Sequence, residues 1–142
     1  MDHNLIHGCT VVLRKSNIQH ALVKFPMLNS LQATAIMVEL NDLETNIGAV
    51  YQSPTKPLVK DDFDKLIGLS KSKKFIFGGY LNCKHTDWNS RRISSRGRKL
   101  ARHADRNHYA ISAPDRPTYY TYRQNAAPDV LDIFLHHIVT SG

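Results

Sequence analysis

The apolar residues of this chain lie in short runs that are rich in β-branched and aromatic side chains and are separated by Pro, Gly, Asn and Asp. Runs of this length and composition predict β-strands, and the turn residues between them indicate where each strand ends. Asn41 and Asp42 supply the turn of an expected antiparallel hairpin. Strands are expected at residues 9–13, 33–40, 45–51, 75–77, 109–111, 118–122 and 130–135.

Two segments show the apolar spacing of three and four residues that is typical of helices. Asp61 is placed to cap the first, which runs through Leu69, and Ser95 is placed to cap the second, which runs to about Asp105. Many strands with two helices predict an α/β fold with layered sheets. A chain of 142 residues has room for one hydrophobic core, so we expect residues 1–142 to form a single domain.

Positive charge is concentrated in one part of the chain. The formal net charge is +7, and residues 91–106 hold seven basic side chains against one acidic side chain, a local charge of +6. The expected helix over 95–106 turns Arg98, Arg102 and Arg106 toward one stripe, which we predict to face solvent. Such a stripe is either a solvated surface or a weak, sequence-indifferent contact to the phosphates of DNA.

The cysteines and histidines show no disulfide or metal-ligand pattern. Cys9 and Cys83 lie far apart and match neither a CxxC motif nor a disulfide framework. No apolar run approaches the roughly 18 residues of a membrane span, and no leader peptide is evident. We therefore expect a soluble protein of the nucleus or cytoplasm, not secreted and without a membrane partner. Surface or capping positions, without a metal, are expected for His85, His103, His108, His136 and His137.

One motif is long enough to be specific. Residues 78–85 read Gly-Gly-Tyr-Leu-Asn-Cys-Lys-His and are followed by Trp88 and by Ser90-Arg91. This segment resembles the GGDxNAKHxxWxSR motif of the endonuclease domain of non-LTR, jockey-like retrotransposons, which also follows an apolar strand. The order and spacing of the segments around this motif test the resemblance further.

The surroundings agree with that resemblance in order and spacing over nearly the whole chain. The family has an apolar GGxAIxI strand, a YxPP element, an RG-basic helix start, a PTY segment and a PDxLD strand. In the same order, the matching segments here are residues 8–13, 51–54, 96–98, 117–120 and 128–132. The resemblance implies a two-sheet sandwich of the endonuclease/exonuclease/phosphatase superfamily. It also implies a reverse transcriptase-associated domain that nicks target DNA with Mg²⁺.

The position match assigns expected roles to individual side chains. Asn82 would bind the phosphate or the attacking water, Tyr51 would donate to the phosphate, and Asp132 would orient a histidine. Thr118 would line the substrate groove, and we expect these four residues to converge at one end of the fold. Tyr80 stands at the position of the family's catalytic Asp. Further substrate-binding candidates are the basic side chains Lys84, His85, Arg91, Arg98 and Arg102.

Plainer interpretations stand beside these roles. Asn82 is also what a tight turn after Gly-Gly requires, because Asn tolerates left-handed backbone geometry. Tyr51 and Thr118 are also ordinary strand residues that serve packing. Asp132 lies in an apolar strand and needs a partner if it is buried. Trp88 is expected to anchor the motif loop by packing.

The chain departs from the family at three places. Tyr80 replaces a carboxylate, and a phenol does not act as one at neutral pH. We expect the N-terminal strands that carry a metal-binding glutamate, and the closing SDH segment with the catalytic histidine, to be missing. The expectation is a degenerate, inactive endonuclease domain. The alternatives are an active endonuclease completed by another chain or segment, with Asp87 as the replacement carboxylate, and a non-enzymatic module that binds nucleic acid or protein. Exposed strands are a further reason to expect self-association.

Overall fold

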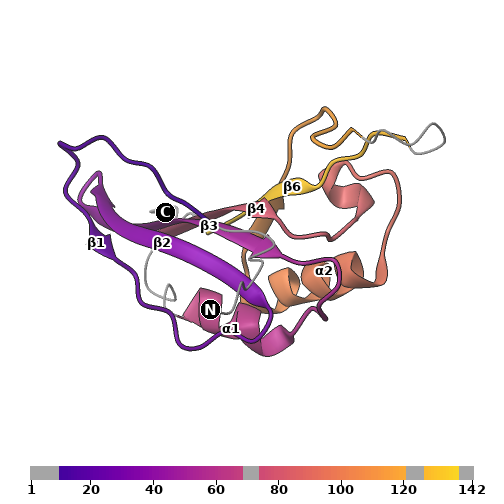
Figure 1. Ribbon diagram of the computed structural model, residues 1–142, viewed down its shortest axis with the longest axis horizontal. Coiled ribbons are helices and arrows are strands. Elements are labelled where there is room, and N and C mark those ends of the chain that lie inside the picture. The colour runs from indigo at the N-terminus through magenta and orange to yellow at the C-terminus, as the bar shows by residue number, and fades with distance from the viewer. Residues whose placement is uncertain (1–9, 69–73, 121–126, 138–142) are drawn as a thin grey trace, which may run out of the picture.

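The computed structural model describes residues 10–68, 74–120 and 127–137. In these ranges six strands form one mixed sheet in the order β1-β2-β3-β4-β6-β5, and two helices pack on one of its faces (Figure 1). This arrangement confirms the expected α/β class. The elements are β1 (Ala21–Leu22), β2 (Leu31–Leu40), β3 (Leu43–Gln52), α1 (Lys60–Gly68), β4 (Lys74–Tyr80), the 3-10 turn η1 (Thr86–Trp88), α2 (Ser95–Asn107), β5 (Ala110–Ser112) and β6 (Asp132–His137).

The sheet is built around the expected hairpin. β2 and β3 pair antiparallel over their full length, and Asn41 and Asp42 make the turn with φ angles of 50° and 63°. Left-handed geometry at both turn positions suits the twist of a two-residue hairpin. Helix α1 then carries the chain across the sheet, so that β4 pairs parallel to β3. The last two strands add antiparallel, β6 beside β4 and β5 beside β6.

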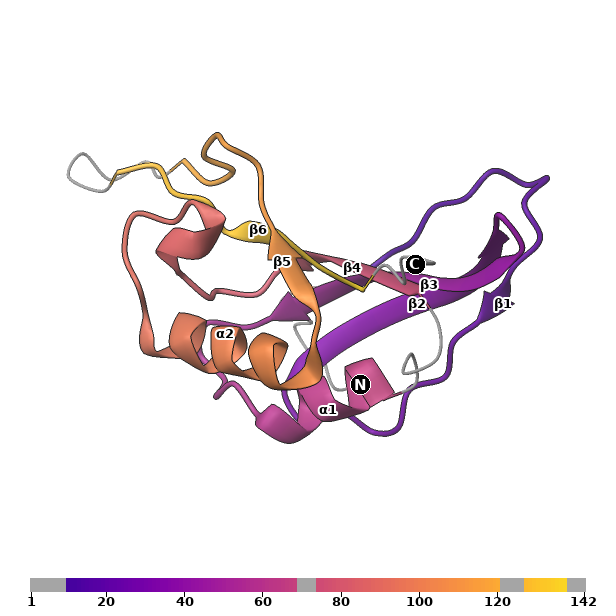
Figure 2. The same cartoon turned by 180° about the vertical axis from the view of Figure 1, so that it is seen from behind.

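The hydrophobic core lies between the sheet and the two helices. Figure 2 shows the arrangement of these elements from behind. Phe63 and Leu66 of α1 and Leu100 of α2 are fully or almost fully buried against Phe77 and Leu135 of the central strands. Burial of side chains of this size stabilises the fold by about 1.5 to 3 kcal/mol each. These buried side chains hold the two helices against the sheet and so help to position the strand ends described below.

A buried carboxylate secures α1 to the start of β2. Asp62 is fully buried, and its oxygens accept the backbone N–H groups of Asn29, Ser30 and Leu31 at 2.7, 2.8 and 3.0 Å. Burial opposes ionisation, but these three hydrogen bonds and the charge of Lys65 hold the pKa of Asp62 below its ordinary value. The carboxylate therefore stays ionised and partnered at neutral pH.

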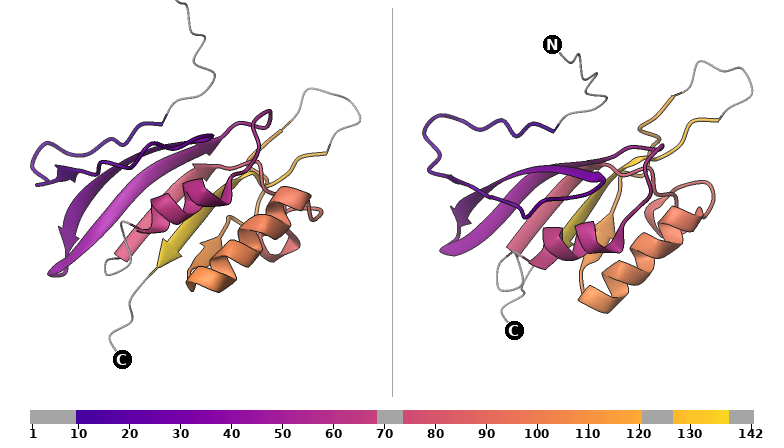
Figure 3. Two further views of the ribbon diagram at one scale, coloured as in Figure 1. Left: turned by 90° about the horizontal axis from the view of Figure 1, so that it is seen from below. Right: turned by 60° about the horizontal axis from the view of Figure 1, so that its bottom comes forward.

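The opposite side of the sheet, which we call the open face, carries no helix in the described ranges (Figure 3). Ile76 of β4 and Phe134 of β6 project from it and are 37% and 47% exposed. The second sheet of the expected sandwich is not formed by the described residues. The open face also carries Tyr51, Tyr80 and Asp132, because directly paired residues of neighbouring strands point to the same side.

Two expected strands are wrong. Residues 10–13 are not in a strand, and Val11 and Leu13 are 62% and 90% exposed. A β-branched composition forms a strand only where the segment pairs with another strand, and these residues do not. In the segment 118–122 only Tyr119 pairs, through an isolated bridge to Asp129, and residues 121 and 122 lie outside the described residues. In the described ranges no helix is long and apolar enough to cross a membrane.

Smaller corrections concern element ends. The second helix is capped by Ser94, whose side chain accepts from the N–H of Gly97, and not by Ser95. Strand β4 continues through both glycines to Tyr80 instead of ending before them. These glycines are packing sites in the sheet: a Cβ on Gly79 would collide with the backbone of Val50.

Candidate functional site

Three predicted site residues form one row across neighbouring strands. Tyr51 of β3 pairs with Tyr80 of β4, and Tyr80 pairs with Asp132 of β6, so all three side chains project from the open face. The rings of Tyr51 and Tyr80 are stacked, with centroids 6.2 Å apart and planes inclined by 20°. We call these three residues the site row. It lies at the end of the sheet where β3 and β4 finish.

Asn82 stands just beyond the site row and joins the ends of two strands. Its backbone is left-handed, with φ 53°, and its side-chain N–H donates to the carbonyl oxygen of Gln52 over 2.7 Å. The left-handed geometry agrees with the turn interpretation of this residue. The amide hydrogen bond also holds the Asn82 side chain next to Tyr51. The role of Asn82 toward a phosphate or water stays a prediction.

Thr118 lies next to the site row, although it belongs to a separate segment of the chain. Its hydroxyl oxygen accepts the backbone N–H groups of Leu131 and Asp132 at 3.0 and 3.1 Å. Thr118 therefore fixes the start of β6 and, with it, the position of the Asp132 side chain. The structure thus brings Tyr51, Tyr80, Asn82, Thr118 and Asp132 together at one end of the sheet, although the roles expected of them are not tested by this placement.

The chemistry of the row is set by Tyr80. Burial raises the pKa of its phenol above the ordinary value, and the neighbouring Tyr119, Asp132 and Tyr51 add to the shift. The phenol is therefore protonated at neutral pH. It can donate one hydrogen bond and offer an aromatic face, but it does not take a proton from water as an ionised carboxylate does.

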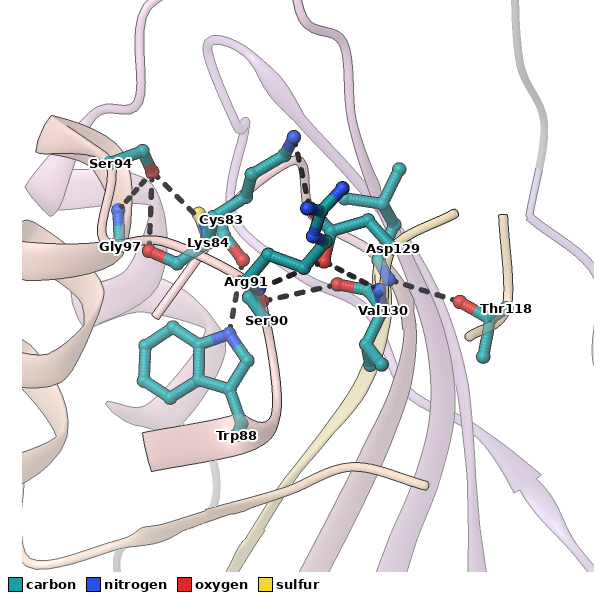
Figure 4. A network of polar contacts seen from close by, with 11 residues as sticks. Cys83, Lys84, Trp88, Ser90, Arg91, Ser94, Gly97, Thr118, Asp129 and Val130 are labelled. Carbon is teal, nitrogen blue, oxygen red and sulfur yellow. Dashed lines mark hydrogen bonds and ion pairs between the residues drawn. The ribbon is translucent and has the colours of Figure 1, made fainter. Parts of the chain in front are cut away.

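A second carboxylate, Asp129, organises the motif loop and was not among the predicted site residues. It is only 6% exposed and accepts from the N–H groups of Val130 and Arg91 at 2.8 and 3.2 Å, while the Lys84 ammonium lies 3.1 Å away (Figure 4). Burial opposes its ionisation, but the N–H of Val130, the Lys84 ammonium and the N–H of Arg91 hold the pKa of Asp129 below its ordinary value. No local pattern marks this residue, because its partners Lys84 and Arg91 come from a distant loop.

The rest of the loop is tied to the same framework, as Figure 4 shows. The indole N–H of Trp88 donates to the carbonyl oxygen of Cys83 over 3.0 Å, and Ser90 Oγ donates to that of Val130 over 3.2 Å. Trp88 is buried, which confirms its expected anchoring role. Helix α2 closes against the loop because Gly97 has no side chain; a Cβ there would collide with the carbonyl oxygen of Lys84.

The basic candidates divide into two groups. Lys84 is paired with Asp129, and His85 Nδ1 accepts the N–H of Asp87 over 3.0 Å and so caps η1. His85 is therefore a capping histidine, as expected. The side chains of the other candidates are exposed: Arg91, Arg98 and Arg102. Binding of substrate by any of them stays a prediction.

His103 contradicts the expectation of surface or capping histidines. It is 6% exposed, and its ring nitrogens lie 2.7 Å from the Tyr109 hydroxyl and 2.8 Å from an Asp64 carboxylate oxygen. It thereby links α1, α2 and the start of β5. The signal was present in the sequence, because His103 is three residues after Leu100 and adjacent to Ala104, both on the inward stripe of α2.

The donor set of the site row fits Mg²⁺ poorly. Mg²⁺ takes oxygen ligands in a near-octahedral arrangement, with carboxylates as its usual protein ligands. The row supplies one carboxylate, that of Asp132, beside two phenols. Among the described residues no group of three or more His, Cys, Asp or Glu side chains is placed to hold a metal ion.

The fold defines the class of protein. The structure superimposes on the endonuclease domain of TRAS1, a telomere-specific non-LTR retrotransposon, with a TM-score of 0.67 and 21% identity over 82% of this chain and 55% of that chain. At this identity the likeness establishes the fold alone. The described sheet and helices therefore share the fold of that domain.

The sequence comparison gives the family. Residues 45–140 match the family model described as endonuclease-reverse transcriptase, so the chain belongs to that family. The chain is also 30% identical over 128 residues to the RNA-directed DNA polymerase from mobile element jockey of Drosophila funebris. The corresponding protein of Drosophila melanogaster is 29% identical over 128 residues. In both cases the match covers 90% of this chain and 14% of the relative.

Proposed function

We propose that this chain is a degenerate endonuclease domain of a retrotransposon polyprotein, in which the scaffold for binding target DNA persists while the activation of water is lost. The ancestral reaction is the metal-dependent nicking of one DNA strand. The observation that carries the proposal is Tyr80, a protonated phenol in the middle of the site row, at the position where the family has aspartate.

Hydrolysis of a phosphodiester sets requirements that the row meets only in part. It needs an aligned water, a base to accept the proton of that water, and positive charge near the phosphate oxygens. Tyr51 and Tyr80 can donate hydrogen bonds to phosphate oxygens, and Asn82 stands beside them. Asp132 is then the carboxylate left in the row, and Thr118 holds its backbone in position. This set binds a phosphate better than it activates water.

Mg²⁺ is expected from the family, where it supplies positive charge at the scissile phosphate. One carboxylate and two phenols are not a favourable set for that ion, since its usual protein ligands are carboxylates. No step of the proposed function therefore depends on a metal held by the described residues.

A plasmid-nicking assay tests the proposal. Supercoiled plasmid is incubated with the 142-residue chain in Mg²⁺, in Mn²⁺ and in EDTA, and open circles are quantified. We expect no conversion above the EDTA control. Robust Mg²⁺-dependent nicking would contradict the proposal and favour the alternative of an active endonuclease. A chain lengthened at both ends, assayed in parallel, distinguishes activity supplied by another segment from activity of these residues.

Non-specific DNA binding through α2 is a second candidate function. Arg98, Arg102 and Arg106 are exposed on α2, while Leu100 and Ala104 are buried on its inward side. The arginine stripe therefore faces solvent, as predicted. A solvent-facing row of guanidinium groups binds phosphates without reading the bases, and such binding weakens as salt rises.

A further inference from the structure

The end of the sheet that holds the site row is rich in accessible aromatic surface. Tyr51 and Tyr80 stack on each other and are partly exposed. Tyr119 pairs with Asp129 through its backbone, is 44% exposed, and has its phenol near enough to Tyr80 to contribute to the raised pKa of that residue. We call Tyr51, Tyr80 and Tyr119 the tyrosine platform.

Cationic groups border this platform on two sides. Arg96 donates from its guanidinium to the carbonyl oxygens of Ser53 and Lys56, and so holds a positive charge just beyond Tyr51. On the other side the backbone of Arg91 is bound to Asp129, next to Tyr119, and its side chain is exposed. The negative charge of Asp129 itself is balanced by Lys84. A ligand that lies across the platform therefore meets aromatic faces in the middle and positive charge at the borders.

We propose that the tyrosine platform is a binding site for single-stranded nucleic acid, in which unpaired bases stack on the tyrosine rings and the flanking phosphates lie near Arg91 and Arg96. Stacking between bases and aromatic side chains, combined with a cationic path for the backbone, is the general mode of single-strand binding. In a duplex the base faces are covered by their neighbours, so the platform selects unpaired strands. Stacking reads no hydrogen-bond pattern, and the site is therefore tolerant of sequence.

The side chain at position 80 determines whether the row can bind a nucleic acid strand. An aspartate at this position would place a second carboxylate beside Asp132 and repel a phosphate backbone, whereas tyrosine removes that charge and adds a ring that stacks on Tyr51. With tyrosine at this position, the row offers an aromatic surface and one carboxylate, Asp132. This binding site goes beyond the proposed nuclease ancestry and does not require any nicking.

Fluorescence anisotropy with labelled oligothymidylate, against a labelled duplex of equal length, tests the proposal. Tyr80→Phe keeps the ring and should bind oligothymidylate as the unmodified chain does. Tyr80→Leu keeps the bulk and loses the ring, and should weaken binding on the order of tenfold. Phe134→Leu removes an exposed ring on the open face outside the platform and is the matched control, which should leave affinity unchanged.

The salt dependence separates stacking from phosphate contacts. Tyr80→Leu should leave the slope of log affinity against log salt unchanged, because no cation is removed. The emission of the buried Trp88 reports whether each variant keeps the fold. If Tyr80→Leu does not fold, the affinity of Tyr119→Leu tests the proposal instead. This variant is suitable because the bridge of Tyr119 to Asp129 uses only the backbone of Tyr119. Unchanged affinity for oligothymidylate in the folded ring-loss variant, or an equal loss of duplex affinity in that variant, overturns the proposal. Neither outcome bears on nicking.

Discussion

The motif loop and the site row adjoin each other but differ in what they keep. In the loop, residues 83–94, the polar groups of Lys84, Trp88, Ser90 and Ser94 all have partners. In the row, the central residue is Tyr80, a protonated phenol at the position where the motif resemblance implies an aspartate. The family match covers both regions. On the proposed function, the scaffold persists while the reactive group that it positions is lost.

The difference follows from what each region does for the fold. Loop residues satisfy buried backbone groups, and losing one leaves an unpaired donor or acceptor that destabilises the chain whether or not it is an enzyme. The row lies on the open face at a strand end, and its side chains are partly exposed. A tyrosine is accommodated there because it packs on Tyr51 and fits a β-strand. The following predictions compare the motif loop with the site row and with the rest of the fold.

Asp129→Ala should have the largest effect. It leaves the N–H groups of Arg91 and Val130 and the Lys84 ammonium without their acceptor, which should lower the free energy of unfolding by roughly 3 kcal/mol. Asp132→Ala, in the row, should cost less than about 1 kcal/mol. Urea unfolding of both variants measures the contrast. Equal losses would show that the row is as important to stability as the loop.

Gly97→Ala should follow in size. The added Cβ collides with the carbonyl oxygen of Lys84, so loop and helix must separate, at a cost of about 2 kcal/mol. Gly68→Ala is the matched control, because the space around Gly68 is open and alanine favours a helix. Thermal melts of the two variants should shift in opposite directions. A neutral Gly97→Ala would mean that loop and helix are not closely packed.

The arginine stripe should show a moderate effect on binding and none on folding. Replacing Arg98, Arg102 and Arg106 with Gln removes three exposed cations, which should weaken binding of any DNA sequence about tenfold at low salt and flatten its salt dependence. Titration of two unrelated duplexes by anisotropy measures this. If affinity does not change, the stripe is a solvated surface with no part in binding.

Acid stability should change least over the physiological range. The folded-state pKa values of Asp62 and Asp129 are lowered, so their contribution is complete above the unfolded-state pKa near 4 and is lost as pH falls through the folded values. The contribution of these two groups to the free energy of unfolding should therefore stay constant from pH 7 to about pH 5 and should fall below pH 4. Asp129→Asn should show a shallower fall. If the free energy of unfolding falls as steeply in Asp129→Asn as in the unmodified chain, Asp129 does not contribute to the acid sensitivity.

How far the sequence predicted the molecule depended on the range of the interactions involved. The hairpin and both helices rest on local patterns, and their ends were predicted to within two residues. The strand at residues 10–13 failed because pairing depends on a free sheet edge, which no local pattern reports. Asp129 was missed because its partners Lys84 and Arg91 come from a distant loop. His103, in contrast, lay in a readable helical pattern.

The most direct test of a preserved scaffold with lost chemistry is Mg²⁺-dependent plasmid nicking by Tyr80→Asp, compared with the unmodified chain. A restored carboxylate can accept the proton of an attacking water, which is worth on the order of 10² to 10⁴ in rate where the other catalytic groups are present. Catalytic groups that act as a unit do not contribute additively, and the described residues of the row place no histidine beside Asp132. We predict that Tyr80→Asp folds as the unmodified chain does and does not nick. Measurable Mg²⁺-dependent nicking by the folded variant would contradict us, because it would show that one substitution alone had silenced an otherwise complete site.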